Sequence, residues 1–391
     1  MKIGIFDPNL DSKGHFLPFN RHIIKLLQDK NNRIIFFDIA DILKNSCQEK
    51  NIEFINVADT PMAELSGELI TLSDRFVFLA KEFFWYREVY KKISRWQSHR
   101  GSSTESGQKN KIDFLIITSL GYFFFYFFIP KVKFAAILHT SDILVFEKKH
   151  SIKYFMQVLK KWVALKFLCQ AEVVFTLDEY LKDKISIFNF KNTEWMPYTC
   201  FENPGSGVYS EKKIKEFTLL TPGAIYRGKN IDFVLDVYKK YNLNFKYIIV
   251  GFPIGVYGRK IVKTVESLEK NTLITGIFRY LPDEEYKEMI QRSSFVLLPY
   301  SKERSNGISA VMHDAFENNT PIIAPNMRPF NYYVNKYSLG LLYAPNEESF
   351  ISVLKKASKI DTSIYKDNFE KFKKDFSYSK TQKKIRRIIA K

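Results

Sequence analysis

The sequence predicts an α/β protein with two Rossmann-like domains, whose mostly parallel sheets face each other across a cleft. Short β-rich runs alternate with helical patterns twice along the chain. The two series are separated at Cys200–Gly207, where a proline and two glycines interrupt both periodicities. The chain of 391 residues is also too long for one compact core, and it fits two domains of ordinary size.

In the first half, β-rich runs and helical spacing alternate as in βα units. We expect strands at Lys2–Asp7, Arg33–Asp38, Ile52–Val57, Asp113–Thr118, Phe134–His139 and Glu172–Leu177. We expect covering helices at Phe16–Gln28, Leu79–Trp96 and Ile152–Leu168, where apolar residues recur at helical spacing. The polar stretch Gln97–Lys111 lacks this spacing and predicts a mobile loop.

The alternation restarts after the break and predicts a second parallel sheet. Its expected strands are Phe217–Thr221, Lys246–Val250, Thr272–Gly276, Ser294–Pro299, Pro321–Ala324 and Gly340–Tyr343. The basic tail after them has the pattern of an amphipathic helix that closes the fold. We therefore expect an N-terminal domain at 1–203, a C-terminal domain at 204–362, and a helical tail at 363–391 that packs back on the N-terminal domain.

The most apolar stretch, Leu120–Pro130, is only about half the roughly 20 residues that a membrane-spanning helix needs. No transmembrane span is expected. Two explanations remain for this stretch, which are a buried helix between two strands and an aromatic surface that faces a membrane.

Composition and charge limit the class of protein. The three cysteines, Cys47, Cys169 and Cys200, have neither disulfide nor zinc-site spacing, so we expect a cytoplasmic protein without a bound metal. The net charge of +18 indicates an anionic partner, which could be a nucleic acid, an anionic membrane surface or a phosphorylated substrate. Charge alone does not choose among them.

Ligands of parallel α/β sheets bind at the carboxyl ends of the strands, so the loops there hold the candidate site residues. After the first strand, Gly14 would let backbone N–H groups approach a phosphate or a sugar. His139 ends another strand of the first half, where an imidazole can bind a substrate hydroxyl or assist proton transfer. A plain βα turn is the alternative for Gly14, and a histidine without a functional role is the alternative for His139.

Three candidates in the second half lie in one loop after the strand Phe217–Thr221. Gly223, Arg227 and Lys229 present two cations beside glycines, which suits a diphosphate. The loop does not have the Walker A pattern, so hydrolysis of a nucleoside triphosphate is disfavoured.

The remaining candidates lie around the start of a later helix. Asn306, Gly307, Ile308 and Ser309 would offer free N–H donors to a phosphate. Asp314 interrupts an otherwise apolar helix face, and its burial calls for a partner such as a ribose hydroxyl. Alternatively, Asp314 is a surface acid that pairs with a lysine.

These pieces together resemble the donor domain of the retaining family 4 glycosyltransferases, also called glycosyl transferases group 1. The resemblance rests on the order and spacing of the basic glycine turn, Val250-Gly251, Gly276, Asp314-Ala315 and Pro321-Ile322-Ile323-Ala324. It covers both halves in architecture but only the second half in motif detail. It implies the GT-B fold, with an acceptor-binding N-terminal domain and a C-terminal domain that binds a nucleotide sugar.

The sequence departs from the paired-glutamate pattern of that family. Asp314 replaces the second glutamate, and the position eight residues upstream is Asn306. The nearest acid, Glu303, lies three residues further upstream, so the first glutamate is absent or displaced. The departure concerns the group near the anomeric carbon.

The resemblance also implies roles for the candidates. Arg227 and Lys229 would stabilise the departing diphosphate, Asp314 would hold the ribose, and residues 306–309 would contact the diphosphate or donor sugar. His139 would lie near the transferred sugar. Such enzymes retain the anomeric configuration and need no metal or other cofactor, because cations and helix N-termini stabilise the developing charge.

We therefore expect a metal-independent transferase that moves a sugar from a nucleoside-diphosphate sugar to a glycan or lipid-linked glycan in surface polysaccharide synthesis. Its expected location is cytoplasmic, with possible peripheral contact to the inner face of the cell membrane. A basic nucleic-acid-binding protein and a non-catalytic protein of the same fold are the alternatives. The absence of recognisable nucleic-acid-binding motifs disfavours the first of these.

Overall fold

The computed structural model describes residues 1–10, 16–29, 32–47, 51–65, 72–98, 111–121, 123–139, 152–198, 216–269, 273–301 and 308–390. Most of the expected loop Gln97–Lys111 and all of the expected break Cys200–Gly207 lie outside these residues. The chain divides into two compact units. The first contains Met1–Tyr198 and Ser379–Lys391, and the second contains Thr199–Tyr378. The expected tail 363–391 is therefore shared between the two units.

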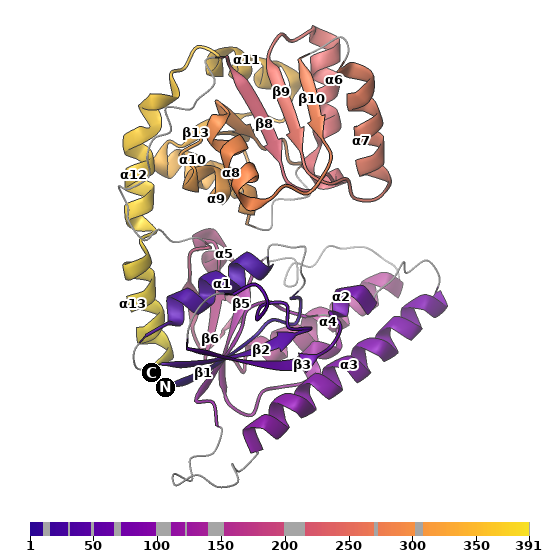
Figure 1. The fold of residues 1–391 in the computed structure, drawn as a ribbon, viewed down its shortest axis with the longest axis vertical. Helices are drawn as coiled ribbons and strands as arrows, with labels where there is room; N and C mark the ends of the chain where they lie inside the picture. The colour runs from indigo at the N-terminus through magenta and orange to yellow at the C-terminus, as the bar shows by residue number, and fades with distance from the viewer. Residues whose placement is uncertain are drawn as a thin grey trace. The chain divides into compact units, whose positions relative to one another are not determined.

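The first unit contains a parallel sheet of seven strands in the order β3-β2-β1-β4-β5-β6-β7 (Figure 1). The strands are β1 (Lys2–Phe6), β2 (Arg33–Ile39), β3 (Ile52–Ala58), β4 (Phe114–Ile117), β5 (Lys133–Leu138), β6 (Val173–Thr176) and β7 (Thr193–Trp195). Six of them lie where the sequence predicts strands. The short edge strand β7 was not predicted, because its three half-buried residues show no alternation.

Helices in the first unit connect and cover these strands. They are α1 (Phe16–Leu27), α2 (Met62–Leu65), α3 (Leu72–Ser98), α4 (Ile152–Leu168), α5 (Glu179–Ile185) and α13 (Tyr378–Ile389), with 3₁₀ turns η1 (Phe124–Phe127) and η2 (Ser186–Phe188). Within Leu120–Pro130, the described residues form the single turn η1 rather than the expected buried helix. Phe125 and Tyr126 pack into the core, whereas Phe127 is exposed.

The second unit contains a parallel sheet of six strands in the order β10-β9-β8-β11-β12-β13. The strands are β8 (Thr218–Pro222), β9 (Lys246–Val250), β10 (Ile274–Ile277), β11 (Phe295–Leu297), β12 (Ile322–Pro325) and β13 (Gly340–Tyr343). The sequence predicts all six, because buried parallel strands read as short apolar runs. Most of the side chains of β8, β11 and β12 are fully buried.

The helices of the second unit connect these strands in sequence. They are η3 (Arg227–Lys229), α6 (Ile231–Tyr241), α7 (Gly255–Leu268), α8 (Asp283–Arg292), α9 (Ala310–Glu317), α10 (Phe330–Tyr337), α11 (Glu347–Ala357), η5 (Thr362–Tyr365) and α12 (Lys366–Asp375). Phe369 and Phe372 of α12 are completely buried. Their rings pack against Phe316 of α9, which fixes α12 to the same unit as the candidate donor residues.

Both sheets reverse their strand order between two central strands. In the first unit the reversal lies between β1 and β4, and in the second between β8 and β11. Connections leave such a pair of strands in opposite directions, which opens a crevice at their carboxyl ends. The fold therefore marks one candidate ligand-binding position in each unit.

Candidate functional site

The crevice of the second unit lies at the carboxyl ends of β8 and β11. The Thr221 hydroxyl on β8 donates to the Leu297 carbonyl on β11 at 2.9 Å, and the hydroxyl of Tyr247 donates to Thr221 at 3.0 Å. Beyond the strands, the Ser301 N–H donates to the Gly228 carbonyl at 3.1 Å. The loop after β8 and the loop after β11 are therefore bonded together, although they are far apart in sequence.

Gly223 forms the first turn of this crevice in a conformation that glycine favours. Its φ is +87°, and a Cβ there would lie 3.2 Å from the Lys229 Nζ and 3.4 Å from the Val311 Cγ2. Gly251 approaches the same turn from β9, where a Cβ would collide with the Gly223 carbonyl oxygen. Two of the predicted motif glycines thus occupy one tight backbone contact.

The two cations of this loop occupy different environments. Arg227 is exposed, whereas Lys229 is only 2% exposed. The Lys229 ammonium donates to the Pro222 carbonyl at the end of β8. A buried ammonium is costly unless polar or anionic groups surround it. Lys229 therefore places a fixed positive charge at the base of the crevice, and Arg227 places a second one at the surface.

Helix α9 begins at the same crevice. Ser309 is buried and caps the helix, with its hydroxyl accepting from the Met312 N–H at 3.3 Å. Ile308 precedes it and is half-buried. The adjoining candidates Asn306 and Gly307, and also Glu303, lie outside the described residues. The described part of the loop thus places the N-terminus of a helix, with its partial positive charge, beside Gly223.

Asp314 lies one turn into α9. Its carboxylate accepts from the Tyr286 hydroxyl of α8 at 2.9 Å. By surface area the residue is only half-buried, yet its carboxyl is surrounded closely enough that desolvation raises its pKa to about 7. The Tyr286 hydrogen bond and the nearby Lys229 charge act in the opposite direction. Asp314 does not form the surface lysine pair considered as its alternative within the described residues.

Tyr286 is a residue that the sequence did not single out. It lies 28 positions before Asp314, and nothing in the local pattern of α8 distinguishes its hydroxyl from that of any other surface tyrosine. Only the packing of α8 beside α9 reveals the contact. His313, next to Asp314, is completely buried among aromatic rings, and this burial lowers its pKa to about 3. It is a core residue.

In the first unit, His139 follows β5 and is half-buried. Its Nε2 lies 2.8 Å from the Thr118 carbonyl, so Nε2 carries the proton and donates. The imidazole packs against the rings of Phe16 and Phe19. Burial lowers the pKa of His139 to about 4, so the side chain is neutral at pH 7. Gly14, the other candidate of this unit, lies outside the described residues.

A polar cluster beside His139 was missed by the sequence analysis. Asp7 follows β1, is fully buried, and accepts from the Asn9 N–H at 2.9 Å, from the Asn20 amide and from the Ser119 hydroxyl. The Thr118 hydroxyl donates to Asn20 at 2.8 Å. The available signal was that Asp7 and Ser119 both follow strands at the point of reversal. Because these groups satisfy one another, the cluster orders the crevice of the first unit.

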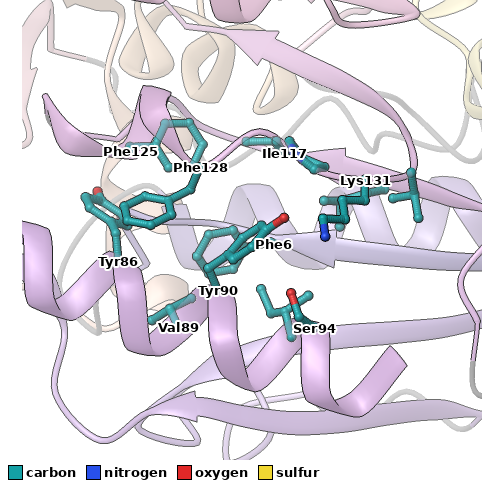
Figure 2. A pocket seen from close by; sticks show the side chains of 13 residues that line it. Phe6, Tyr86, Val89, Tyr90, Ser94, Ile117, Phe125, Phe128 and Lys131 are labelled. Carbon is teal, nitrogen blue, oxygen red and sulfur yellow. The ribbon is translucent and has the colours of Figure 1, made fainter. Parts of the chain in front are cut away.

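A separate apolar pocket lies on α3 of the first unit. Its volume is about 40 Å³, and Tyr86, Val89 and Tyr90 of α3 face Phe125 and Phe128 across it (Figure 2). It contains none of the candidate residues. Among the described residues, no three His, Cys, Asp or Glu side chains gather as a metal site. No helix in the described ranges is long and apolar enough to cross a membrane.

Comparison with known proteins finds a family match within the second unit. Residues 209–375 match the family model of glycosyl transferases group 1. No curated protein sequence matches the chain.

This chain is a glycosyltransferase with the GT-B fold.

Solved structures agree over almost the whole length. Sucrose-phosphate synthase from Thermosynechococcus elongatus aligns with a TM-score of 0.68 at 14% identity, covering 99% of this chain and 98% of that one. The E. coli structure described as trehalose-6-phosphate bound with UDP-2-fluoro glucose has a TM-score of 0.68 at 10% identity. The alignment covers 100% of this chain and 99% of that one. WaaG, a glycosyltransferase of lipopolysaccharide biosynthesis, has a TM-score of 0.60 at 14% identity, covering 100% and 99%. At identities this low, the likenesses to these solved structures show the fold of this chain and not its substrates.

Proposed function

We propose that this glycosyltransferase retains the anomeric configuration, works without a metal, and moves a sugar from a nucleoside-diphosphate sugar to a glycan or lipid-linked glycan of a surface polysaccharide. The observation that carries the proposal is the buried Lys229 ammonium at the reversal between β8 and β11. Gly223 and the N-terminus of α9 adjoin it. Backbone donors and a fixed cation together suit a diphosphate.

The proposed chemistry follows from where negative charge develops. When the bond between the anomeric carbon and the diphosphate oxygen breaks, the leaving diphosphate gains negative charge. Lys229 and Arg227 would stabilise that charge, and residues 306–309 at the start of α9 would add N–H donors. Because the buried Lys229 is held in place before the reaction, little reorganisation of this charge is needed. This arrangement supports transfer without a divalent cation.

Asp314 is proposed to hold the ribose of the donor. Its carboxylate lies on the same helix whose N-terminus faces the diphosphate, and Tyr286 orients it. In the first unit, His139 is proposed to contact the transferred sugar, and Gly14 is proposed to line the donor site. A neutral imidazole suits a sugar hydroxyl better than it suits a phosphate, because it carries no charge at pH 7.

The Lys229→Met variant tests the diphosphate site. Methionine retains an unbranched apolar stem of similar length, so packing is largely kept while the charge is removed. We expect nucleoside-diphosphate affinity, measured by calorimetry with UDP and GDP, to fall by about tenfold or more, since a charged hydrogen bond contributes about 1.5–3 kcal/mol. Transfer from the corresponding sugar donors should fall further.

Lys263→Ala is the matched control, because Lys263 is an exposed lysine of α7 in the same unit. It should bind the nucleotide as the wild type does. Unchanged transfer in Lys229→Met would remove this site from the proposal. Absence of transfer and of nucleotide binding in the wild type would favour the non-catalytic alternative, and tight, length-dependent binding of nucleic acid would favour the nucleic-acid-binding alternative.

Metal independence and stereochemistry have their own measurement. We expect turnover to continue in EDTA, with the product showing the same anomeric configuration as the donor by proton NMR. A strict requirement for Mn²⁺ or Mg²⁺ would contradict the proposed charge stabilisation. An inverted product would contradict retention while leaving the diphosphate site intact.

A further inference from the structure

One surface of the first unit exposes large apolar side chains. On α3, Val77 and Phe84 are 54% and 56% exposed, and Phe127 of η1 is 53% exposed. Phe83 and Ile129 are exposed to a smaller extent. We call these five residues the aromatic surface. Its members lie on α3 and on the segment that follows β4.

Contacts between α3 and η1 show that these residues form one surface. The ring of Phe128 lies 6.1 Å from Phe83 and 5.7 Å from Tyr90, and the Tyr90 hydroxyl donates to the Ile129 carbonyl at 3.2 Å. Phe127 and Ile129 therefore flank a residue that is fixed against α3. Val77 precedes Phe84 by two helical turns, so both lie on the same side of that helix.

The opposite side of α3 is already occupied. Tyr86, Val89 and Ile93 are buried and face the sheet and Phe125, as Figure 2 shows for Tyr86 and Val89. The exposed residues are therefore not displaced core residues. They form a second apolar face of α3. The core of the first unit does not need this face, because α3 already buries its other apolar face.

The aromatic surface is bordered by positive charge. Along α3 between Val77 and Trp96, the exposed described cations are Lys81, Arg87, Lys92 and Arg95. The exposed acid among the described side chains of that span is Glu88, which pairs with Lys91 at 2.7 Å. Lys131 and Lys133 are exposed directly after Ile129. A partner of this surface must accept aromatic rings and also carry negative charge.

We propose that the aromatic surface docks on an anionic lipid bilayer, with the phenylalanine rings in the interfacial region and the surrounding lysines and arginines at the headgroups. Aromatic rings flanked by basic side chains are the combination that binds such an interface. The inference deepens the proposed function and rests on it for its purpose, because a bilayer is where a lipid-linked acceptor resides. It follows the second explanation of Leu120–Pro130, an aromatic surface that faces a membrane, since the exposed residues of this segment would face lipid.

The test is sedimentation of the full chain with vesicles of phosphatidylcholine alone and of phosphatidylcholine with phosphatidylglycerol. We expect binding to the anionic vesicles that weakens as salt rises, and little binding to the neutral ones. The double variant Phe84→Ser with Phe127→Ser should lose about tenfold or more in vesicle affinity, because two rings no longer leave water.

Two further variants keep the result interpretable. Ile187→Ser removes an apolar side chain of the same unit that is 75% exposed but lies on η2, and it should bind vesicles as the wild type does. Lys81→Glu with Arg87→Glu leaves the rings in place and should abolish the preference for anionic lipid. This charge variant tests the proposal even if the serine variant fails to fold.

Failure of the wild type to bind anionic vesicles would overturn the inference, as would equal losses in Ile187→Ser and the double serine variant. Self-association that the serine variant abolishes, without vesicle binding, would replace the lipid by a second copy of the chain. Nucleotide binding reports on the proposed function separately. It should be unchanged in all three variants, so loss of vesicle binding alone leaves the donor site in place.

Discussion

At the residue scale, Gly223 combines a backbone conformation that favours glycine with little space for a side chain. Its positive φ is costly for a residue with a Cβ, and the space beside it is taken by the Lys229 ammonium and Val311. Gly255 also has a positive φ, of +62°, but a Cβ there would meet nothing within 4 Å. Comparing substitutions at Gly223 and Gly255 therefore distinguishes the effect of backbone strain from the effect of a side chain that crowds the crevice.

We predict that Gly223→Ala and Gly255→Ala each lower the free energy of unfolding by about 1–2 kcal/mol, because both force a side chain into a left-handed conformation. Only Gly223→Ala should also weaken nucleoside-diphosphate binding. Thermal melting and calorimetry measure the two effects. Equal nucleotide affinity in both variants would show that the Gly223 turn does not contact the donor.

The raised pKa of Asp314 predicts that the stability of the protein depends on pH. Its pKa is about 7 in the folded protein, against 3.8 for an ordinary aspartate, so between these values the folded state binds the proton more tightly than the unfolded state. The contribution of this group to stability is therefore present below about pH 4 and is lost as pH rises to about 7. Asp314→Asn removes this dependence.

The melting temperature of Asp314→Asn relative to wild type should therefore rise between about pH 5 and pH 8, by the equivalent of about 1–3 kcal/mol. Asp236→Asn is the control, because Asp236 is exposed on α6 and is not among the charges that act on Asp314, so the slope should stay close to that of the wild type. Parallel melting curves for Asp314→Asn and wild type would mean that the carboxyl is not protonated in this range.

At the residue scale, the sequence singled out residues whose local pattern is distinctive. Gly223, Lys229 and Asp314 were chosen because glycine, a cation and a lone acid stand at strand ends or on an apolar face, and donor binding by these residues stays a prediction. Tyr286, Asn20 and Ser119 were not found, because each acts through a partner that only the fold brings near. The environments of Gly14, Asn306 and Gly307 stay predictions.

At the element scale, the capped N-terminus of α9 lies at the crevice of the second unit. Ser309 caps α9 beside Gly223, and Asn346 caps α11 elsewhere in the same unit by accepting from the Ser349 N–H at 2.9 Å. We predict that Ser309→Ala and Asn346→Ala each cost about 1 kcal/mol of stability, because each leaves a helix N–H unsatisfied. Calorimetry with UDP should show weaker binding only for Ser309→Ala. Weaker binding in both variants would mean that general destabilisation explains the effect.

The elements themselves were predictable to different degrees. Buried parallel strands such as β8 and β12 read as apolar runs between turn residues, so their positions followed from the sequence. The edge strand β7 and the turn η1 did not, because three or four residues give no periodicity and tertiary contacts determine their conformation. The aromatic run at Leu120–Pro130 has the composition of a buried helix. Its residues instead divide between the core and the surface.

At the scale of the whole molecule, the chain passes from the second unit back to the first after Tyr378. There α13 buries Ile385 and Ile389. Arg386 and Gln382 donate to the Gln28 carbonyl after α1, at 2.6 and 3.3 Å, and Lys384 donates to the Trp195 carbonyl of β7 at 2.8 Å. The basic tail pattern predicted a helix, but not that its donors would satisfy carbonyls at a helix end and an edge strand.

This attachment makes α13 part of the first unit and leads to a prediction about where stability is lost. Ile385→Ala with Ile389→Ala should destabilise the first unit by about 4–8 kcal/mol, since each buried isoleucine contributes about 2–4 kcal/mol. Hydrogen exchange should increase in α1, β2 and β7, while β8 and β9 keep their protection. Nucleotide binding should persist, because the diphosphate-site residues Gly223, Arg227 and Lys229 belong to the second unit, whereas α13 belongs to the first. Ile364→Ala, which changes a side chain of η5 that is 63% exposed, should leave exchange unchanged in both units. Faster exchange in β8 and β9 of the double variant would show that the two units unfold together and that α13 stabilises the molecule as a whole.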